Sequence, residues 1–558
     1  MITKLRWQLI IVAVTILIVV GLLLIPDASQ VGYSPKPSDG GVYSEALVGG
    51  FSRLNPLLDS NNPADRDVDR LIFSGLVSYD AAGLPTPELA DSWGVSQDGK
   101  TYNFSIRQNA VWHDNTPVTV DDVIYTIGLI SEDASLYPAS VKDLWKKVEI
   151  KKLNDKTVQF VLPEPFAPFL DYLTFGILPV HLLAGTNAEA LASAPFNLSP
   201  VGTGPYKFDK LIIENGKIAG VQLAANDLFY KHRPFIDQVI FKYYADSESA
   251  YAAYSGGQVL GISQIPPSVI SKALSDPGLN MYSARLPELS IILFNLNAPE
   301  VAFFQDAQVR AALYQGVNRK YIVEKLMAGQ AIQADSPIFP GTWAYNDQIK
   351  PVSYDPQKAL TLLKKAGYIL AAQSETVRQD KDGKKLAFTL VHPDDELHAK
   401  IADSIKQDWA VLGVDVTLKP MPYDQLKNTA LGTRDFQAAL VDINLMKTPD
   451  PDPYPFWHES EATGGQNYSQ WTNRAASEFL EQARINPDYT ERARLYKNFQ
   501  VIFANEKPAI PLYYPVYTFG INASLQNAQI PPLFDTSDRF LTISDWFLVT
   551  RRSLNKAQ

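Results

Sequence analysis

Six histidines are the side chains best suited to proton transfer or metal binding, and their spacing indicates neither role. They are His113, His181, His232, His392, His398 and His458. The closest two, His392 and His398, enclose the acidic run 394–396, which is more typical of a solvated turn than of a metal site. The sequence has no cysteine, which excludes thiolate metal sites, cysteine nucleophiles and disulfides. We therefore expect neither a metal nor a cofactor.

The motifs of nucleophilic catalysis and nucleotide binding are also absent from the sequence. It has no G-x-S-x-G elbow, no G-x-x-x-x-G-K-[ST] loop and no H-E-x-x-H pair. The Gly202-Thr203-Gly204 segment lacks the third glycine of a dinucleotide-binding turn. A carboxylate pair for glycoside hydrolysis stays open, because the two groups need only lie roughly 5 to 10 Å apart in space. These patterns favour binding over catalysis, and we expect no enzyme.

Sheet and helix signals alternate along the part of the chain that would position a site. Asp98-Gly99, Asn154-Asp155 and Asn215-Gly216 each separate two short apolar segments, which predicts three β-hairpins. Asp355-Pro356 is typical of a helix start and Gly367 of a helix stop.

A second helix is predicted by an apolar stripe in the C-terminal half. The stripe consists of Ile401, Ile405, Trp409 and Leu412. It is closed by Gly413 and followed by the alternating segment 414–418, which predicts a strand. Helices that alternate with strands in this way indicate an α/β protein.

Length and composition limit the class of protein. The 558 residues are enough for several domains, and with 46% apolar and 20% charged residues the chain can bury a large core. The 50 basic and 60 acidic residues give a net charge of -10, the opposite sign to a phosphate-binding surface. Nucleic acid is therefore not an expected partner.

The N-terminus predicts attachment to a membrane. Lys4 and Arg6 precede the apolar segment 9–25, which at about 1.5 Å per residue nearly spans a bilayer as a helix. The basic residues should stay in the cytoplasm, which places the folded part on the extracytoplasmic side of the cell membrane. Because no A-x-A site follows, we expect residues 1–26 to be an uncleaved anchor. A cleaved signal and a buried core helix are the alternatives, and residues 27–41 read as a flexible tether.

A series of short motifs follows in a fixed order between about residues 42 and 520. They include Leu54 to Leu57, Pro87 to Arg107, Val111 to Val123, Val201 to Tyr206, Val309 to Leu313, Val317 to Arg319, Tyr354 to Pro356 and Asp450 to Pro453. This ordered set resembles the family 5 extracytoplasmic solute-binding proteins, the oligopeptide and dipeptide receptors of ABC importers. The chain departs from many relatives in lacking a lipid-bearing cysteine, and the helix of residues 1–26 would replace that lipid.

The resemblance implies an α/β, two-lobed, periplasmic-binding-protein-like (type II) fold with an extra inserted domain, preceded by the transmembrane helix. Lobe I should comprise residues 42–82, 200–285 and 515–558, with the inserted domain at 83–199. Lobe II should comprise residues 286–514. The two crossings between the lobes, near 285 and 515, would form a hinge that closes over ligand.

The resemblance also implies where a peptide would bind. In the family the ligand lies along a strand that here is 436–444, and alternation places Leu440, Asp442 and Asn444 on one face of it. The peptide ammonium needs a carboxylate, which could be Asp442 or Asp450. Each has a structural alternative: Asp442 could bond a neighbouring amide, and Asp450 could form an Asx-turn before proline. Some peptide-binding relatives carry Arg at the position of Leu440.

Three aromatic residues match positions that enclose ligand in the family. Phe51 precedes the 54–57 motif, Tyr137 belongs to the inserted domain, and Trp457 follows the Asp-Pro segment. Each could instead belong to a core, because aromatic residues are highly buried on average.

The function implied is that of a monomeric extracytoplasmic receptor that captures a peptide by hinge closure and delivers it to the permease of an ABC transporter. Two other classes stay open. A surface-anchored hydrolase would need a nucleophile or an acid pair in the cleft. A peptide sensor or chaperone-like receptor would share the fold without serving a transporter.

Overall fold

The computed structural model describes residues 33–132, 136–137, 139–445 and 448–554. Within this part of the chain the largest element is a 12-stranded sheet, whose main path has the order β17-β16-β18-β14-β19-β12-β2-β11-β10-β9. Two further strands, β13 and β15, pair with β19 outside that path. The strands are β2 (Val42–Val48), β9 (Tyr206–Glu214), β10 (Lys217–Ala225), β11 (Gln238–Tyr244), β12 (Gly261–Ile262), β13 (Leu279–Arg285), β14 (Glu288–Phe294), β15 (Ala331–Gln333), β16 (Ala387–Pro393), β17 (Asp415–Met421), β18 (Ala438–Asn444) and β19 (Ala509–Asn522).

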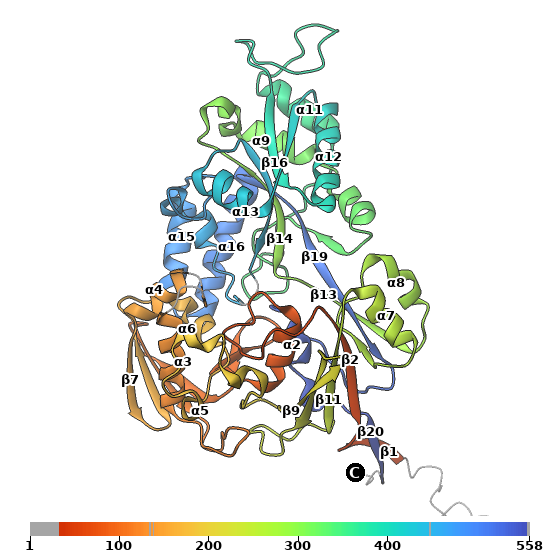
Figure 1. Ribbon diagram of the computed structural model, residues 1–558. Helices are drawn as coiled ribbons and strands as arrows, with labels where there is room; N and C mark the ends of the chain where they lie inside the picture. Colours follow the sequence, from red (N-terminus) through yellow and green to blue (C-terminus); the bar gives the residue numbers. More distant parts are fainter. Residues whose placement is uncertain (1–32, 133–135, 138, 446–447, 555–558) are drawn as a thin grey trace, which may run out of the picture.

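Strand β19 belongs to both halves of this sheet, as Figure 1 shows. Its residues 509–513 pair with β14 and its residues 516–522 pair with β13. Between β13 and β14 the chain passes through Leu286, whose N–H donates to the Pro515 carbonyl at 2.9 Å. The crossings expected near 285 and 515 lie at this junction. We keep the names lobe I, inserted domain and lobe II for the residue ranges given above, and that division stays a prediction.

The predicted hairpins and helices are confirmed. Asp98-Gly99 connects β5 (Ala90–Val95) to β6 (Thr101–Ile106), and Asn154-Asp155 connects β7 (Glu149–Asn154) to β8 (Thr157–Val161). Asn215-Gly216 connects β9 to β10, and each of the three pairs is antiparallel. Helix α11 (Pro356–Lys365) begins after Asp355, whose side chain accepts the Lys358 N–H. The second predicted helix is α12 (Glu396–Val411), and β17 follows it.

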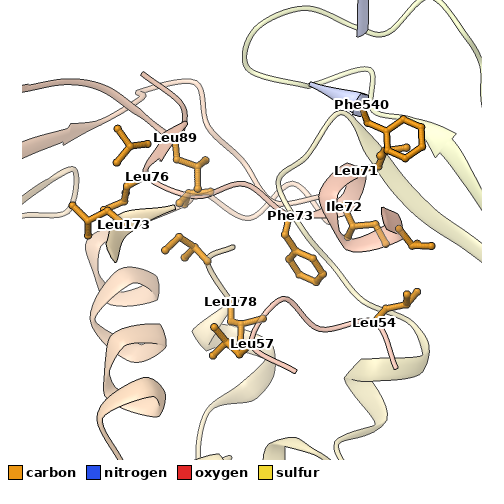
Figure 2. Close-up of a cluster of buried hydrophobic side chains, with 14 of the residues drawn as sticks. Leu54, Leu57, Leu71, Ile72, Phe73, Leu76, Leu89, Leu173, Leu178 and Phe540 are labelled. Atoms are coloured by element: carbon orange, nitrogen blue, oxygen red, sulfur yellow. The ribbon is translucent and has the colours of Figure 1, made fainter. Parts of the chain in front are cut away.

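Lobe I and the inserted domain share one hydrophobic core. Lobe I adds α2 (Pro63–Ile72), β3 (Val77–Tyr79), α7 (Ser247–Ser255), α8 (Pro267–Leu274), η8 (Thr536–Phe540) and η9 (Ile543–Asp545). Figure 2 shows Leu71 and Phe540 of lobe I in the same cluster as Leu89, Leu173 and Leu178 of the inserted domain. Because the apolar faces are buried against each other, the inserted domain is packed as a continuation of lobe I.

The inserted domain has a four-stranded sheet of its own, in the order β5-β6-β8-β7. Its elements are β4 (Pro85–Pro87), β5 (Ala90–Val95), β6 (Thr101–Ile106), α3 (Val120–Glu132), α4 (Ala139–Lys147), β7 (Glu149–Asn154), β8 (Thr157–Val161), η2 (Ala167–Leu173), α5 (Val180–Leu183), α6 (Ala188–Leu191) and η3 (Pro195–Leu198). The segment η2 carries Asp171, which becomes important at the site.

Lobe II places its sheet between two separate cores. One core includes Leu313, Leu363 and Trp409 from the helices on one face, and the other includes Leu480 and Phe499 from the helices on the opposite face. The helical segments are η4 (Pro299–Gln305), α9 (Ala307–Gln315), α10 (Arg319–Tyr321), η5 (Ile322–Leu326), α13 (Tyr423–Gln425), η6 (Leu426–Leu431), α14 (Tyr454–Trp457), η7 (Glu459–Ala462), α15 (Arg474–Ile485) and α16 (Tyr489–Glu506), with α11 and α12 as above.

The pairing of two strands from opposite ends of the chain corrects one expectation. Residues 33–38 of the expected tether form strand β1 (Tyr33–Ser38), which pairs with β20 (Val549–Leu554). The prediction of a flexible segment is wrong for these residues, because a strand from the other end of the chain satisfies their backbone groups. The predicted anchor, residues 1–26, lies outside the described residues. Among the helices that are described, none has the length and apolar character needed to cross a bilayer.

Candidate functional site

A cavity of about 610 Å³ lies where lobe I, the inserted domain and lobe II meet. Lobe I contributes residues 56–57 and 59–61 and one side of α2, the inserted domain contributes Tyr137 and residues 171–172 and 174–176, and lobe II contributes Thr448 and Pro449. The volume is in the range of small-molecule sites. An occupant would therefore touch all three parts of the protein.

Charged side chains line the cavity, and its two arginines already have acidic partners. Arg66 forms an ion pair with Asp535 at 2.9 Å, and Arg70 forms one with Asp538 at 3.2 Å. Among the described lining residues five are acidic and two are basic; the acidic ones are Asp59, Asp69, Asp171, Asp535 and Asp538. This balance favours a cationic group on an occupant over an anionic one.

Asp171 of the cavity wall joins the inserted domain to lobe I and to lobe II. It accepts a hydrogen bond from the Tyr79 hydroxyl at one carboxylate oxygen, and from the Asp450 N–H at 3.0 Å at the other. Burial and the neighbouring charge of Asp450 raise the pKa of Asp171 well above its usual value.

The predicted ligand residue Asp450 is buried directly behind the cavity lining, next to Pro449. Its carboxylate lies 2.7 Å and 2.8 Å, through its two oxygens, from Nη2 of Arg492. The Arg492 guanidinium in turn lies over the rings of Trp343 and Tyr489, at 4.9 and 5.4 Å. Burial raises the pKa of Asp450, while Arg492 opposes that rise. A ligand ammonium at Asp450 would have to share the carboxylate with this guanidinium.

The other predicted carboxylate, Asp442, lies in lobe II away from the cavity lining. One of its oxygens accepts from Nε2 of His398 at 2.9 Å, and Asp395 lies 2.7 Å from Nδ1 of the same ring. The second oxygen of Asp442 is buried and has no hydrogen-bond partner among the described residues. Burial, with the charge of Asp442, raises the pKa of the adjacent Glu288 to about 7.

The two remaining strand residues have opposite environments. The register of β14 against β18 puts Leu440 opposite Ile292 and Asn444 opposite Glu288. Leu440 is fully buried in a lobe II core, whereas Asn444 is exposed. Neither lines the cavity.

The three predicted aromatic residues also differ in position. Tyr137 lines the cavity with its ring 6.5 Å from that of Phe175, and burial raises the pKa of its hydroxyl. Phe51 packs on the lobe I core and is not part of the cavity lining. Trp457 is 3% exposed and packs edge-on against Phe503 at 4.7 Å, so the structure places it in the core.

Sequence reasoning missed the residues that hold this site together. Asp171 and Arg492 were not singled out, and neither were the cavity arginines Arg66 and Arg70. The available signal was a single acid in the apolar run 167–173, because an isolated charge in such a run needs a partner. Nothing local identifies that partner, which lies 279 residues further along the chain.

Comparison with known proteins supplies the relatives of this architecture. The family model of the bacterial extracellular solute-binding proteins, family 5 (middle region), matches residues 85–466. The dipeptide-binding protein of Escherichia coli K12 is 26% identical over 498 residues, which cover 83% of this chain and 90% of that protein.

Two solved structures are similar along almost the whole chain. The oligopeptide-binding protein AppA of Bacillus subtilis, in complex with a nonapeptide, has 25% identity and a TM-score of 0.67 and covers 92% of this chain and 100% of its own. NikZ of Campylobacter jejuni, in complex with Ni(L-His), has 25% identity and a TM-score of 0.68. The match covers 91% of this chain and 99% of NikZ. These findings confirm the two-lobed α/β fold and the resemblance drawn from the motifs. The chain belongs to the bacterial extracellular solute-binding proteins of family 5.

Proposed function

We propose that this protein is the extracytoplasmic receptor of an ABC importer, which captures a peptide in the 610 Å³ cavity and delivers it to a membrane permease. The observation that carries the proposal is the origin of the cavity walls. Because lobe I, the inserted domain and lobe II all line it, binding stabilises the arrangement in which they are together. A permease can then distinguish the loaded receptor from the empty one.

The relatives support a peptide as the ligand. The Escherichia coli relative is named a dipeptide-binding protein, and the Bacillus subtilis structure holds a nonapeptide. The family members are substrate-binding proteins, and we propose no catalysis for this chain. NikZ, whose structure holds Ni(L-His), shows that a relative can bind a metal complex, so the ligand class needs a direct test.

Peptide capture would use the acidic side of the cavity. The ligand ammonium would lie near Asp450, beside Pro449 of the lining. Asp442 on β18, which lies away from this lining, is the alternative carboxylate that the resemblance implies. Tyr137 would cover the bound peptide from the inserted domain.

The test is calorimetry with di-, tri- and tetra-alanine and their N-acetylated forms, on the wild type and on Asp442→Asn and Asp450→Asn. Losing the carboxylate that pairs with a desolvated ammonium costs about 2 to 5 kcal/mol, or roughly thirty-fold to several thousand-fold in affinity. We expect one variant to lose most of its affinity for free peptides and the other to lose little. Acetylation of the peptide should weaken its binding to the wild type. Normal binding of free peptides by both variants would overturn amino-terminal capture. Failure of every peptide to bind the wild type would overturn the peptide class itself.

Closure has its own measurement. A saturating alanine peptide should reduce the radius of gyration in small-angle scattering, because the lobes approach each other around the ligand. An unchanged radius would contradict capture by hinge closure.

We further propose that residues 1–26 stay attached and hold the receptor, as a monomer, at the outer face of the cell membrane. The mature protein should then fractionate with membranes and begin at or near Met1. Peptide mapping that finds an N-terminus after Ser29 would contradict the anchor.

A further inference from the structure

A second cavity, of about 520 Å³, lies at the junction of the two lobes. Both crossings line it, through residues 285–287 and Val516. Lobe II contributes Phe339 and residues 340–342, and lobe I contributes residues 530–534 from its C-terminal segment. We call this cavity the hinge pocket. Phe534 also lines the larger cavity, so the two cavities share this residue.

Arg285, the last residue of β13, is the charged side chain of the hinge pocket. It is half-buried, and among the described residues its guanidinium has no hydrogen bond and no ion pair. Every other arginine between residues 50 and 545 donates a hydrogen bond or forms an ion pair. Arg285 is therefore an exception in a chain that otherwise gives its guanidinium groups a partner.

The backbone of lobe II makes room for this guanidinium. A Cβ atom at Gly341 would lie 2.7 Å from Nη2 of Arg285, closer than van der Waals contact allows. Gly341 also has a φ of +89°, which residues with a side chain rarely adopt. Glycine thus lets the charged group of the β13 crossing lie directly against lobe II.

The surroundings of Arg285 are mainly apolar, although Ser283 and Thr342 also line the pocket and Tyr345 and Tyr514 lie close enough to interact electrostatically. Phe339, Pro340 and Leu533 line the same space, together with Pro531 and Pro532. Burial lowers the pKa of Arg285, yet a guanidinium stays charged in any protein environment. A charge that is partly desolvated and has no partner opposes folding, so its stability contribution does not explain it.

We propose that the hinge pocket binds a small organic carboxylate, with the acid group on Arg285 and an apolar body between Phe339 and the prolines of the C-terminal segment. The guanidinium can donate two parallel hydrogen bonds to one carboxylate, which is the strong, directional form of this contact. One cation in an apolar space selects one acid group with an apolar body. This site is separate from the peptide site proposed above and does not depend on it.

The experiment is calorimetry on the whole ectodomain with phenylacetate, its uncharged analogue phenylacetamide, and inorganic phosphate. Phenylacetate should bind more tightly than both other probes. Arg285→Gln should weaken phenylacetate binding about tenfold or more, because a charge-assisted hydrogen bond is lost. Arg53→Gln is the matched control, since Arg53 is another half-buried arginine and lines neither cavity. Its phenylacetate affinity should equal that of the wild type.

Four results would overturn the proposal. They are no phenylacetate binding to the wild type, equal binding of phenylacetamide, phosphate binding as tight as phenylacetate, and an affinity that falls in Arg53→Gln but not in Arg285→Gln. Thermal unfolding midpoints check that both variants fold. If Arg285→Gln does not fold, Arg285→Lys keeps the charge without the paired donors and should bind phenylacetate more weakly than the wild type. An unchanged affinity in that variant would count against the guanidinium contact.

Discussion

Two buried arginines, Arg539 in lobe I and Arg492 in lobe II, have similar partners and different roles. Arg539 is fully buried and binds Glu45 at 2.7 Å and Asp67 at 2.6 Å. All three of these residues belong to lobe I. Arg492, also fully buried, binds Asp450, whose N–H reaches Asp171 in the inserted domain. The first cluster lies within one lobe, whereas the second continues across the contact between lobe II and the inserted domain.

The difference teaches which charges belong to the fold and which belong to the site. The Arg539 cluster has two acids for one guanidinium, and burial raises the pKa of both Glu45 and Asp67 while Arg539 opposes the rise. It can change only if lobe I unfolds. The Asp450–Asp171 contact can break while both parts stay folded, and it lies beside the cavity where ligand would bind.

The largest expected effect is that of Arg539→Met. Removing this guanidinium leaves two buried carboxylates without their cation, and losing one partner of such a pair costs about 3 to 5 kcal/mol. The measurement is the free energy of unfolding in urea. Arg474→Met is the control, because Arg474 pairs with three glutamates at the surface and should change stability little. Equal losses in the two variants would remove the distinction between buried and exposed clusters.

Arg492→Met should cost less, about 2 to 3 kcal/mol, because it leaves a single acid that can take up a proton. Hydrogen exchange should then speed up at the Asp450 amide, which bonds Asp171, and stay slow at the Asp67 amide in α2. Faster exchange at both amides would mean that the two clusters unfold as one unit.

Gly83→Ala tests the contact between lobes without touching a charge. A Cβ there would lie 3.0 Å from the Phe534 ring and 3.2 Å from the Pro449 carbonyl oxygen of lobe II, at a φ of +81°. Gly216→Ala is the matched control, with a φ of +75° and nothing within 4 Å. The backbone strain, about 1 kcal/mol, should be common to both variants. Only Gly83→Ala should lose more unfolding free energy than this strain, because its neighbours must also shift by a few tenths of an ångström. Equal losses in the two variants, measured by urea unfolding, would contradict a close interlobe contact at this point.

The smallest expected effect is a change in the pH dependence of the free energy of unfolding in Asp171→Asn. Because the folded state raises the pKa of Asp171 above its usual 3.8, it binds a proton that the unfolded state has lost, and this contribution to stability falls as the pH rises above 3.8. Asparagine does not titrate and removes this contribution. The free energy of unfolding of the variant should therefore rise relative to that of the wild type as the pH rises. Asp98→Asn gives the opposite sign, since hydrogen bonds from Ser96 and Lys100 lower the pKa of Asp98. Unfolding free energies across the pH range check both signs.

Sequence patterns predicted the elements well where local chemistry decides them. Asn215 and Gly216 have φ values of +52° and +75°, the left-handed pair that a tight hairpin turn requires, and Asp355 caps its helix as expected. The prediction of a flexible tether is wrong at residues 33–38, because a strand at the far end of the chain pairs with them.

The candidate site was predictable only in part. Tyr137 lines the cavity and Asp450 lies next to it, and their roles in holding a ligand stay predictions. Leu440 and Trp457 lie in cores, and their spacing could not reveal this, because a face of a strand or helix has the same period toward a cleft as toward a core. The pairing of Asp171 with Asp450 depends on how separate parts of the chain come together.

The Arg539 cluster also sets the order in which the chain can fold. Glu45 and Asp67 are synthesised 494 and 472 residues before the arginine that neutralises them. Lobe I therefore cannot close around these acids in its final form until Arg539 has been added to the chain. Strand β19, at residues 509–522, leaves the ribosome almost as late. The last steps of lobe I folding thus wait for residues made long after its first strands.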